Sequence, residues 1–319
     1  SNEGRCTQCH AGYGWADNTF DFGDPENIDC LVCHDQTFDE ATKLGTYVKA
    51  KTTAGLPEND ANSLNLVAQS VAMGKPTIRN CIRCHANAGG GDNVKHGDLA
   101  LALKDTTKEF DVHMGTADSG GLDFECVTCH VADSEHGIGG MPYHSVDEGE
   151  MKRCDDCHGS AAVRHAGTSV ELVIQSHPTL ACQTCHIPTF AREQSTKTEW
   201  YWERAGQVVD PIPVDPDTGR PTFDRKKGDF VWANNVRPTL KFFNGKYEKA
   251  LINVSDTYTA EPVVLAEPVG DCNDPDSMVY PFKKMIGNQI ANTTTRTIMA
   301  PHLFGSAGGP NPFWGNWDW

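Results

Sequence analysis

Apolar residues are sparse along this chain, and they follow a regular period in only a few places. Residues 61–73 (ANSLNLVAQSVAM) and 169–176 (SVELVIQS) carry the apolar spacing of short helices. Residues 226–253 alternate apolar and polar positions around an Asn-Gly-Lys turn, which predicts a β-hairpin or a small sheet. No stretch approaches the roughly 18 apolar residues that a membrane span requires. The pattern therefore predicts short helices, irregular chain and a small β region, with no membrane span.

The composition provides few apolar side chains from which to build a hydrophobic core. Only 38% of the 319 residues are hydrophobic, the mean hydropathy is −0.47, and the chain contains 30 glycines and 18 prolines. The formal net charge is −16, which repels nucleic acid, so we expect no nucleic-acid partner.

Cysteines change this picture, because twelve of the thirteen fall in six copies of one pentapeptide. The copies are CTQCH at 6–10, CLVCH at 30–34, CIRCH at 81–85, CVTCH at 126–130, CDDCH at 154–158 and CQTCH at 182–186. Two thiols three positions apart can add to the two vinyl groups of a porphyrin, and the histidine that follows then ligates the iron. A zinc knuckle or a redox CxxC would not require that histidine in every copy. We expect six covalently attached haem c groups that replace the missing apolar core.

The motifs assign the attachment cysteines and the proximal iron ligands. The cysteines are Cys6, Cys9, Cys30, Cys33, Cys81, Cys84, Cys126, Cys129, Cys154, Cys157, Cys182 and Cys185, and the proximal ligands are His10, His34, His85, His130, His158 and His186. Covalent haem attachment is completed outside the cytoplasm, so we expect an exported protein, periplasmic or extracellular, with Ser1 following a cleavage site or another boundary. Cys272 is the one cysteine outside the motifs, and it could be a free thiol, form an intermolecular disulfide or lie near a haem.

Seven histidines outside the motifs nearly match the number of irons. They are His96, His113, His136, His144, His165, His177 and His302. This near-parity makes each one a candidate distal ligand, although one must be surplus and solvated surface histidine is the alternative for any of them. Bis-histidine haems have closed coordination, which suits electron relay rather than substrate binding.

The loop at residues 89–98, GGGDNVKHGD, offers an exception to that closed coordination. Lys95 could ligate an iron if its amine stays deprotonated, while the adjacent His96 reaches a different iron. Asp92 would then place a carboxylate near a substrate on that haem. The alternative is a plain glycine turn with Asp92 and Lys95 in solvent.

The motifs also divide the chain. Residues 1–190 hold all six motifs and form the expected hexahaem core, whereas residues 191–319 have none and form a haem-free C-terminal region. The last ten residues, PNPFWGNWDW, place four aromatic side chains at a terminus. We expect them to dock on a haem, on the same chain or on a neighbouring subunit.

Several long segments resemble one known family. They are CTQCHAGYGWADNTFDFGDPENIDCLVCHD, GKPTIRNCIRCHANAGGGDNVKHGDL, DVHMG, ACQTCHIPTFAREQSTKT and GDFVWANNVRPTLKFFNG. They are similar to the octahaem tetrathionate reductases, distant relatives of hydroxylamine oxidoreductase. The resemblance implies a multihaem c-type cytochrome, mainly α and irregular, with a haem-packed core and a small β-containing C-terminal region. It also implies that the haem of His10 takes Lys95 as its unusual ligand, with Asp92 close by.

This sequence departs from that family in three places. The family's first and last haem motifs and its active-site cysteine have no counterpart here, so the resemblance implies a six-haem form. We therefore expect a hexahaem electron carrier whose copies self-associate head to tail into a continuous haem chain, an extracellular filament. Redox partner proteins or extracellular acceptors complete the expected set of partners. The alternatives are a reductase of tetrathionate, nitrite or hydroxylamine at the haem of His10, and a monomeric periplasmic shuttle.

Overall fold

A computed structural model describes most of the chain. The described residues are 21, 24–38, 41, 70–87, 89–94, 99–134, 136–140, 151–249, 255–303 and 311–319. Six of the predicted site residues lie outside these ranges: Cys6, Cys9, His10, Lys95, His96 and His144. Among the described helices, none is long and apolar enough to cross a membrane.

Each of the five described haem motifs forms a turn of helix. The helices are α2 (Cys30–His34), α5 (Ile78–His85), α6 (Cys126–Cys129), α7 (Cys154–His158) and α10 (Cys182–His186). In α2 the Asp29 carboxylate caps the helix by accepting a hydrogen bond from the Leu31 amide at 3.1 Å. Residues three apart share a helix face, so this local structure turns both cysteines of a motif to one side.

The remaining helices are also short. They are α8 (Ala161–His165), α9 (Glu171–Ser176) and α11 (Phe313–Asn316), with 3-10 turns η2 (Pro25–Asn27), η3 (Leu101–Asp105), η4 (Ala117–Ser119) and η5 (Trp202–Arg204). The helix predicted at 169–176 is confirmed as α9, whereas most of the one predicted at 61–73 lies outside the described residues.

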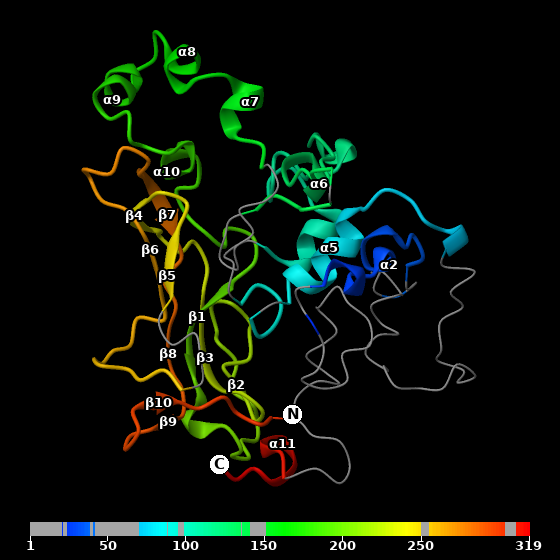
Figure 1. Cartoon of the computed structure of the whole chain (residues 1–319), viewed down its shortest axis with the longest axis vertical. Helices are drawn as coiled ribbons and strands as arrows, with labels where there is room; N and C mark the ends of the chain where they lie inside the picture. Colours follow the sequence, from blue (N-terminus) through cyan, green and yellow to red (C-terminus); the bar gives the residue numbers. More distant parts are fainter. Residues whose placement is uncertain are drawn as a thin grey trace.

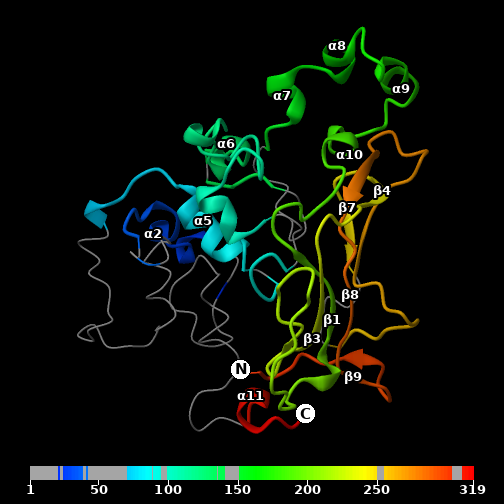
Figure 2. The ribbon, with the colours of Figure 1, turned by 180° about the vertical axis from the view of Figure 1, so that it is seen from behind.

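Helices and strands occupy different parts of the molecule (Figure 1). Helices α2, α5 and α6 lie together, and α7 to α10 continue from them as an open arc at one end of the long axis. The strands run along the opposite side, and α11 lies at the other end of the long axis from α8 and α9. The view from behind shows the same arrangement (Figure 2).

All described strands follow the last haem motif. They are β1 (Thr196–Tyr201), β2 (Phe223–Asp224), β3 (Gly228–Ala233), β4 (Thr239–Phe243), β5 (Tyr247–Lys249), β6 (Ala266–Pro268), β7 (Met278–Phe282), β8 (Ile286–Asn288), β9 (Ala291–Asn292) and β10 (Thr297–Ile298). Four of them form a sheet in the order β2-β3-β1-β8, in which β1 pairs antiparallel with β3 and parallel with β8.

Of the two alternatives predicted for residues 226–253, the small sheet is confirmed and the hairpin is wrong. Strands β4 and β5 flank the Asn244-Gly245 turn, yet β4 pairs with β7 and β5 pairs with β6. Phe243, Tyr247, Tyr280 and Phe282 form one ring cluster with centroid separations of 5.1–6.1 Å. Packing of these rings across distant strands explains why the local turn does not close a two-stranded ladder.

The protein core around the helices is small. Ile78, Ile82, Ala86 and Leu103 are buried together between α5 and η3. By contrast, nearly every side chain between residues 152 and 180 is exposed or half-buried. This distribution agrees with a fold in which a large cofactor, not side chains, fills the space between the helices.

The aromatic C-terminus folds back on its own chain. The Phe313 ring is buried and stacks on Trp319 with centroids 3.5 Å apart, and Trp319 meets Trp202 edge-on at 6.2 Å. The Arg225 guanidinium lies 4.0 Å from the ring centroid of Trp317. Of the three docking sites predicted for this segment, the structure contains the one on the same chain.

Candidate haem-binding site

The five described motifs form a continuous row, here called the motif row. Thiols of Cys81 and Cys126 lie within hydrogen-bonding reach, as do those of Cys154 and Cys182. The hydrogen bond with Cys126 and then burial raise the pKa of the Cys81 thiol, and Cys33 is also close enough to contribute. A further close approach joins the fourth and fifth motifs, where burial and then the Cys157 thiol raise the pKa of Cys129. Each described motif thus neighbours the next one in the sequence.

Two pairs of histidines have the separation expected for axial ligands of one iron. The rings of His165 and His186 have centroids 6.1 Å apart, and those of His113 and His158 have centroids 6.0 Å apart. An imidazole nitrogen lies about 2 Å from a metal that it ligates, so two axial rings on one iron have centroids about 6 Å apart. In each pair one histidine is a motif histidine and the other is a predicted distal ligand. The geometry fits haem at both places.

Backbone carbonyls orient four histidine rings through Nδ1. The acceptors are Gly74 O for His34 at 2.8 Å, Gly139 O for His130 at 2.7 Å, Ala161 O for His165 at 2.8 Å and Val173 O for His177 at 3.1 Å. Metal-ligating histidines usually donate their second ring N–H in this way, which leaves Nε2 for the metal. The same arrangement therefore occurs in proximal and in predicted distal histidines.

The surroundings of His85 favour its neutral form. Desolvation of the imidazole, and secondarily the charge of His130, lowers the pKa of His85 below its ordinary value. A neutral imidazole is the ligating form, so this environment favours iron binding by His85.

Two further distal candidates, His136 and His302, also lie in the described part of the chain. His136 has a positive φ of 65° and its amide donates to Asp133 O, while His302 lies beside α11, where its carbonyl accepts from the Phe313 amide. Neither position identifies an iron, so ligation by His136 and His302 stays a prediction.

The described part of the glycine loop is fastened to the C-terminal region. One carboxylate oxygen of Asp92 accepts from the Leu101 amide at 2.7 Å, and the other accepts from Gln194 Nε2 at 2.9 Å. The Asn93 amide group donates to the carbonyl oxygens of Gln194 and Ser195. Both oxygens of Asp92 thus hold the loop in place, which is a structural role.

Three lysines where the glycine loop meets the C-terminal region were not identified from the sequence. Lys227 donates to Gly90 O at 2.9 Å, and Lys283 donates to Val94 O and to the Thr196 hydroxyl. The third, Lys197, is only 2% exposed, and its Nζ atom lies 3.2, 4.3 and 5.1 Å from the ring centroids of Phe230, Trp200 and Trp232.

These lysines carry little signal in the sequence. Lys197 stands opposite Trp232 in the β1–β3 register, which only the strand pairing reveals. Burial, and then the positive charge of Lys227, lowers the pKa of Lys197 to about 7.

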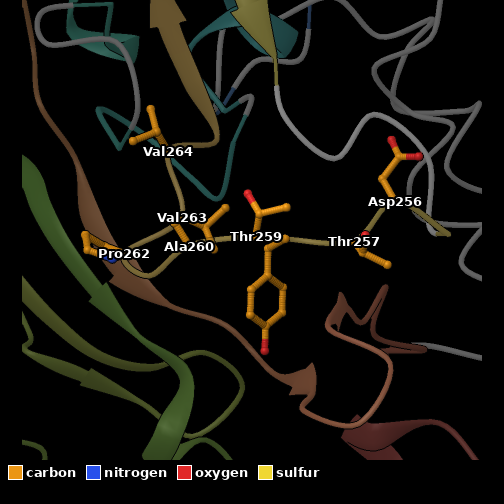
Figure 3. Close-up of a pocket in the computed structure, with 8 residues that line it drawn as sticks. Asp256, Thr257, Thr259, Ala260, Pro262, Val263 and Val264 are labelled. Carbon is orange, nitrogen blue, oxygen red and sulfur yellow. The ribbon is translucent and has the colours of Figure 1, made fainter.

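The described residues offer no alternative metal centre. No group of three or more histidine, cysteine, aspartate or glutamate side chains that could hold a metal ion occurs among them, and their eleven cysteines are free of disulfides. A shallow hollow of about 560 Å³ is lined by residues of the segment 256–264, well after the last motif (Figure 3). Its lining contains no histidine or cysteine, so it is separate from the haem-binding residues.

Known proteins resemble this chain in both sequence and structure. A family model described as bacterial cytochrome c matches residues 197–319. The crystal structure of an octahaem cytochrome c from Shewanella oneidensis matches the whole chain with 35% identity and a TM-score of 0.75, and the chain spans 66% of that protein. An uncharacterised protein of Archaeoglobus fulgidus is 29% identical over 138 residues, which are 40% of this chain and 44% of the relative. The chain thus spans less than two thirds of both relatives.

These likenesses and the motif geometry define the class. The chain is related to multihaem c-type cytochromes, and covalently bound haem c is the cofactor that its cysteine pairs and the relatives support. Within that class, the solved structure that it resembles is an octahaem cytochrome c. The relation supports a function in electron transfer or redox chemistry.

Proposed function

We propose that this protein is a hexahaem c-type cytochrome that carries electrons outside the cytoplasm. The continuity of the motif row carries the proposal, because neighbouring haems in sequence would also be neighbours in space. Bound haem would supply reversible one-electron chemistry at each site, and the two cysteines and the histidine of each motif would hold it. Covalent attachment of haem places the mature protein in the periplasm or outside the cell.

We further propose that copies associate head to tail, so that the row continues from one molecule to the next as a filament. The described part of the row runs from α2 through α5, α6 and α7 to α10, so different motifs lie at its two ends (Figures 1 and 2). The remaining partners are redox proteins or extracellular acceptors. With a net charge of −16, the protein favours partners with a positive surface.

The described contacts favour an electron carrier over a reductase. If His113 with His158 and His165 with His186 each hold one iron, neither haem would offer a position for substrate, and both oxygens of Asp92 already accept hydrogen bonds. A reductase would need an exchangeable ligand such as Lys95 at the haem of His10. Turnover of tetrathionate, nitrite or hydroxylamine by the reduced protein would favour that alternative.

Three measurements on the haem-loaded chain test the proposal. Mass spectrometry should find six haems, a reductive titration should take up six electrons, and negative-stain microscopy should show filaments. A haem count below six overturns the hexahaem assignment. Dispersed monomers at every concentration and salt condition overturn the filament while leaving electron transfer intact.

A further inference from the structure

Two tripeptides in the sequence have the form Asn-X-Ser or Asn-X-Thr in which X is not proline. They are Asn253-Val254-Ser255 and Asn292-Thr293-Thr294. This form is the acceptor sequence for N-linked sugar in exported proteins. Asn253 and Val254 lie outside the described residues, whereas the structure describes the whole of the second tripeptide.

The second tripeptide lies at the tip of a β-hairpin. Strands β9 and β10 pair antiparallel with Asn292 opposite Thr297, and residues 293–296 form the turn between them. Residues 292–296 are all exposed. A sugar is bulky and strongly hydrated, so an exposed turn of this kind can carry one without displacing packed side chains.

The Asn292 side chain is held by its oxygen and leaves its nitrogen accessible. Its Oδ1 atom accepts hydrogen bonds from the amides of Thr294 and Thr295 at 3.0 and 3.1 Å. In the described part of the chain, neither Asn292 Nδ2 nor the Thr294 hydroxyl has a hydrogen-bond partner. N-linked sugars are attached at Nδ2, so the atom that would react is oriented and free.

The base of the hairpin is anchored to the segment that lines the hollow. The Tyr258 amide donates to Arg296 O, and Arg296 Nε donates to Tyr258 O, each at 2.8 Å. The Arg296 guanidinium also lies 4.8 Å from the ring centroid of Tyr258, which is buried. Strands β9 and β10 lie toward the end of the long axis opposite α8 and α9 (Figures 1 and 2). A sugar on Asn292 would therefore leave this anchor and the helices α7 to α10 uncovered.

We infer that Asn292 carries an N-linked glycan in the mature protein, an inference that rests on the export included in the proposed function. The donor is a lipid-linked sugar phosphate, and a glycosyltransferase outside the cytoplasm catalyses the transfer. A bond forms between Asn292 Nδ2 and C1 of the sugar, the bond from C1 to the phosphate oxygen breaks, and the amide loses one proton. The lipid phosphate is the leaving group, and the transfer needs no oxidant or reductant.

Peptide mapping of the haem-loaded protein, purified from the cells that naturally produce it, tests this inference. Trypsin cleaves after Lys284 and Arg296, so the acceptor lies in the peptide 285–296. The mass of this peptide should exceed its sequence mass by one or more sugar residues, and electron-transfer fragmentation should locate them on Asn292. An unmodified peptide, sugar on a threonine oxygen, or sugar confined to Asn253 overturns the inference.

Two matched variants of Thr294, made in the same cells, separate the acceptor sequence from the fold. Thr294→Ala removes the hydroxyl that the acceptor sequence requires but keeps the backbone amide that bonds Asn292 Oδ1, so it should lose the sugar completely. Thr294→Ser keeps the acceptor sequence and should keep the sugar. Asn273→Gln, at an exposed asparagine outside both tripeptides, should leave the sugar unchanged. A Thr294→Ala chain that still carries sugar on Asn292 contradicts the inference.

Haem counting on the same samples separates this inference from the proposed function. Six haems together with an unmodified peptide 285–296 contradict the glycan and leave the electron carrier standing. Sugar on Asn292 in a chain with fewer than six haems supports the glycan and contradicts the hexahaem assignment. A haem-free chain retained in the cytoplasm contradicts both.

Discussion

Replacing Lys197 with methionine should stabilise this protein at low pH and have little effect at high pH. The Lys197 amine is nearly inaccessible, lies among three aromatic rings, and has no carboxylate or carbonyl acceptor among the described residues. Methionine has a similar length and no charge, so it can occupy the same space without desolvating an ammonium group.

The expected size of the effect follows from opposing terms. The gap between the ordinary lysine pKa of 10.5 and the value of about 7 corresponds to roughly 5 kcal/mol, at about 1.4 kcal/mol per pKa unit. Attraction of the ammonium to the ring faces offsets about 2 kcal/mol of this penalty. Desolvation therefore wins, and the charged amine costs the folded state about 3 kcal/mol.

The pH window follows from the direction of the change. A pKa that is lower in the folded state means that the unfolded chain binds the extra proton between about pH 7 and 10.5. The cost is complete below pH 7, declines as the pH rises and disappears above 10.5. Asp224 acts against this lowering, whereas Lys227 and Lys283 reinforce it.

Urea unfolding of the haem-loaded protein at pH 6, 8 and 10 measures the effect. At pH 6 the free energy of unfolding of Lys197→Met should exceed that of wild type by about 3 kcal/mol, and the gap should shrink toward pH 10. Lys226→Met, at an exposed lysine, is the control and should show no such trend. A Lys197→Met variant that is less stable than wild type at pH 6, or a gap that does not change with pH, refutes this reasoning.

Three other predictions concern the loop, an axial ligand and the cofactor. Gly90→Ala should lower the free energy of unfolding by roughly 2–4 kcal/mol, because φ is +118° and the added Cβ would lie 2.4 Å from the Trp200 ring. The control is Gly219→Ala, also at positive φ but with no atom within 4 Å of the added Cβ, which should lower the free energy of unfolding by only about 1 kcal/mol. Equal losses in the two variants would contradict the explanation. His113→Ala should convert one iron from low-spin to high-spin in the EPR spectrum, and an unchanged spectrum would mean that His113 is not the partner of His158. Chain produced without haem attachment should lack native circular dichroism, and a native-like spectrum would show that side chains alone form the core.

Local chemistry could be predicted from the sequence because it depends on spacing. Two cysteines three apart with a following histidine need only one helical turn to face a porphyrin, and all five described motifs form such a turn. The short helix at 169–176 and the late β region followed from apolar periodicity in the same way.

Long-range pairing could not be predicted in this way. The Asn244-Gly245 turn favours a hairpin locally, but β4 and β5 gain more by pairing with strands that come later in the chain. The pairing of His113 with His158 joins residues 45 positions apart, and no spacing rule identifies it.

By itself, then, the sequence predicted haem c as the cofactor, its covalent attachment and the proximal histidines, since these depend on bonds made within five residues. Only the tertiary structure decided that the described motifs form one row, that His165 lies opposite His186 and His113 opposite His158, and that Lys197 lies among aromatic rings. These features join segments brought together by packing and strand pairing, and a linear pattern contains no information about which distant residues will meet.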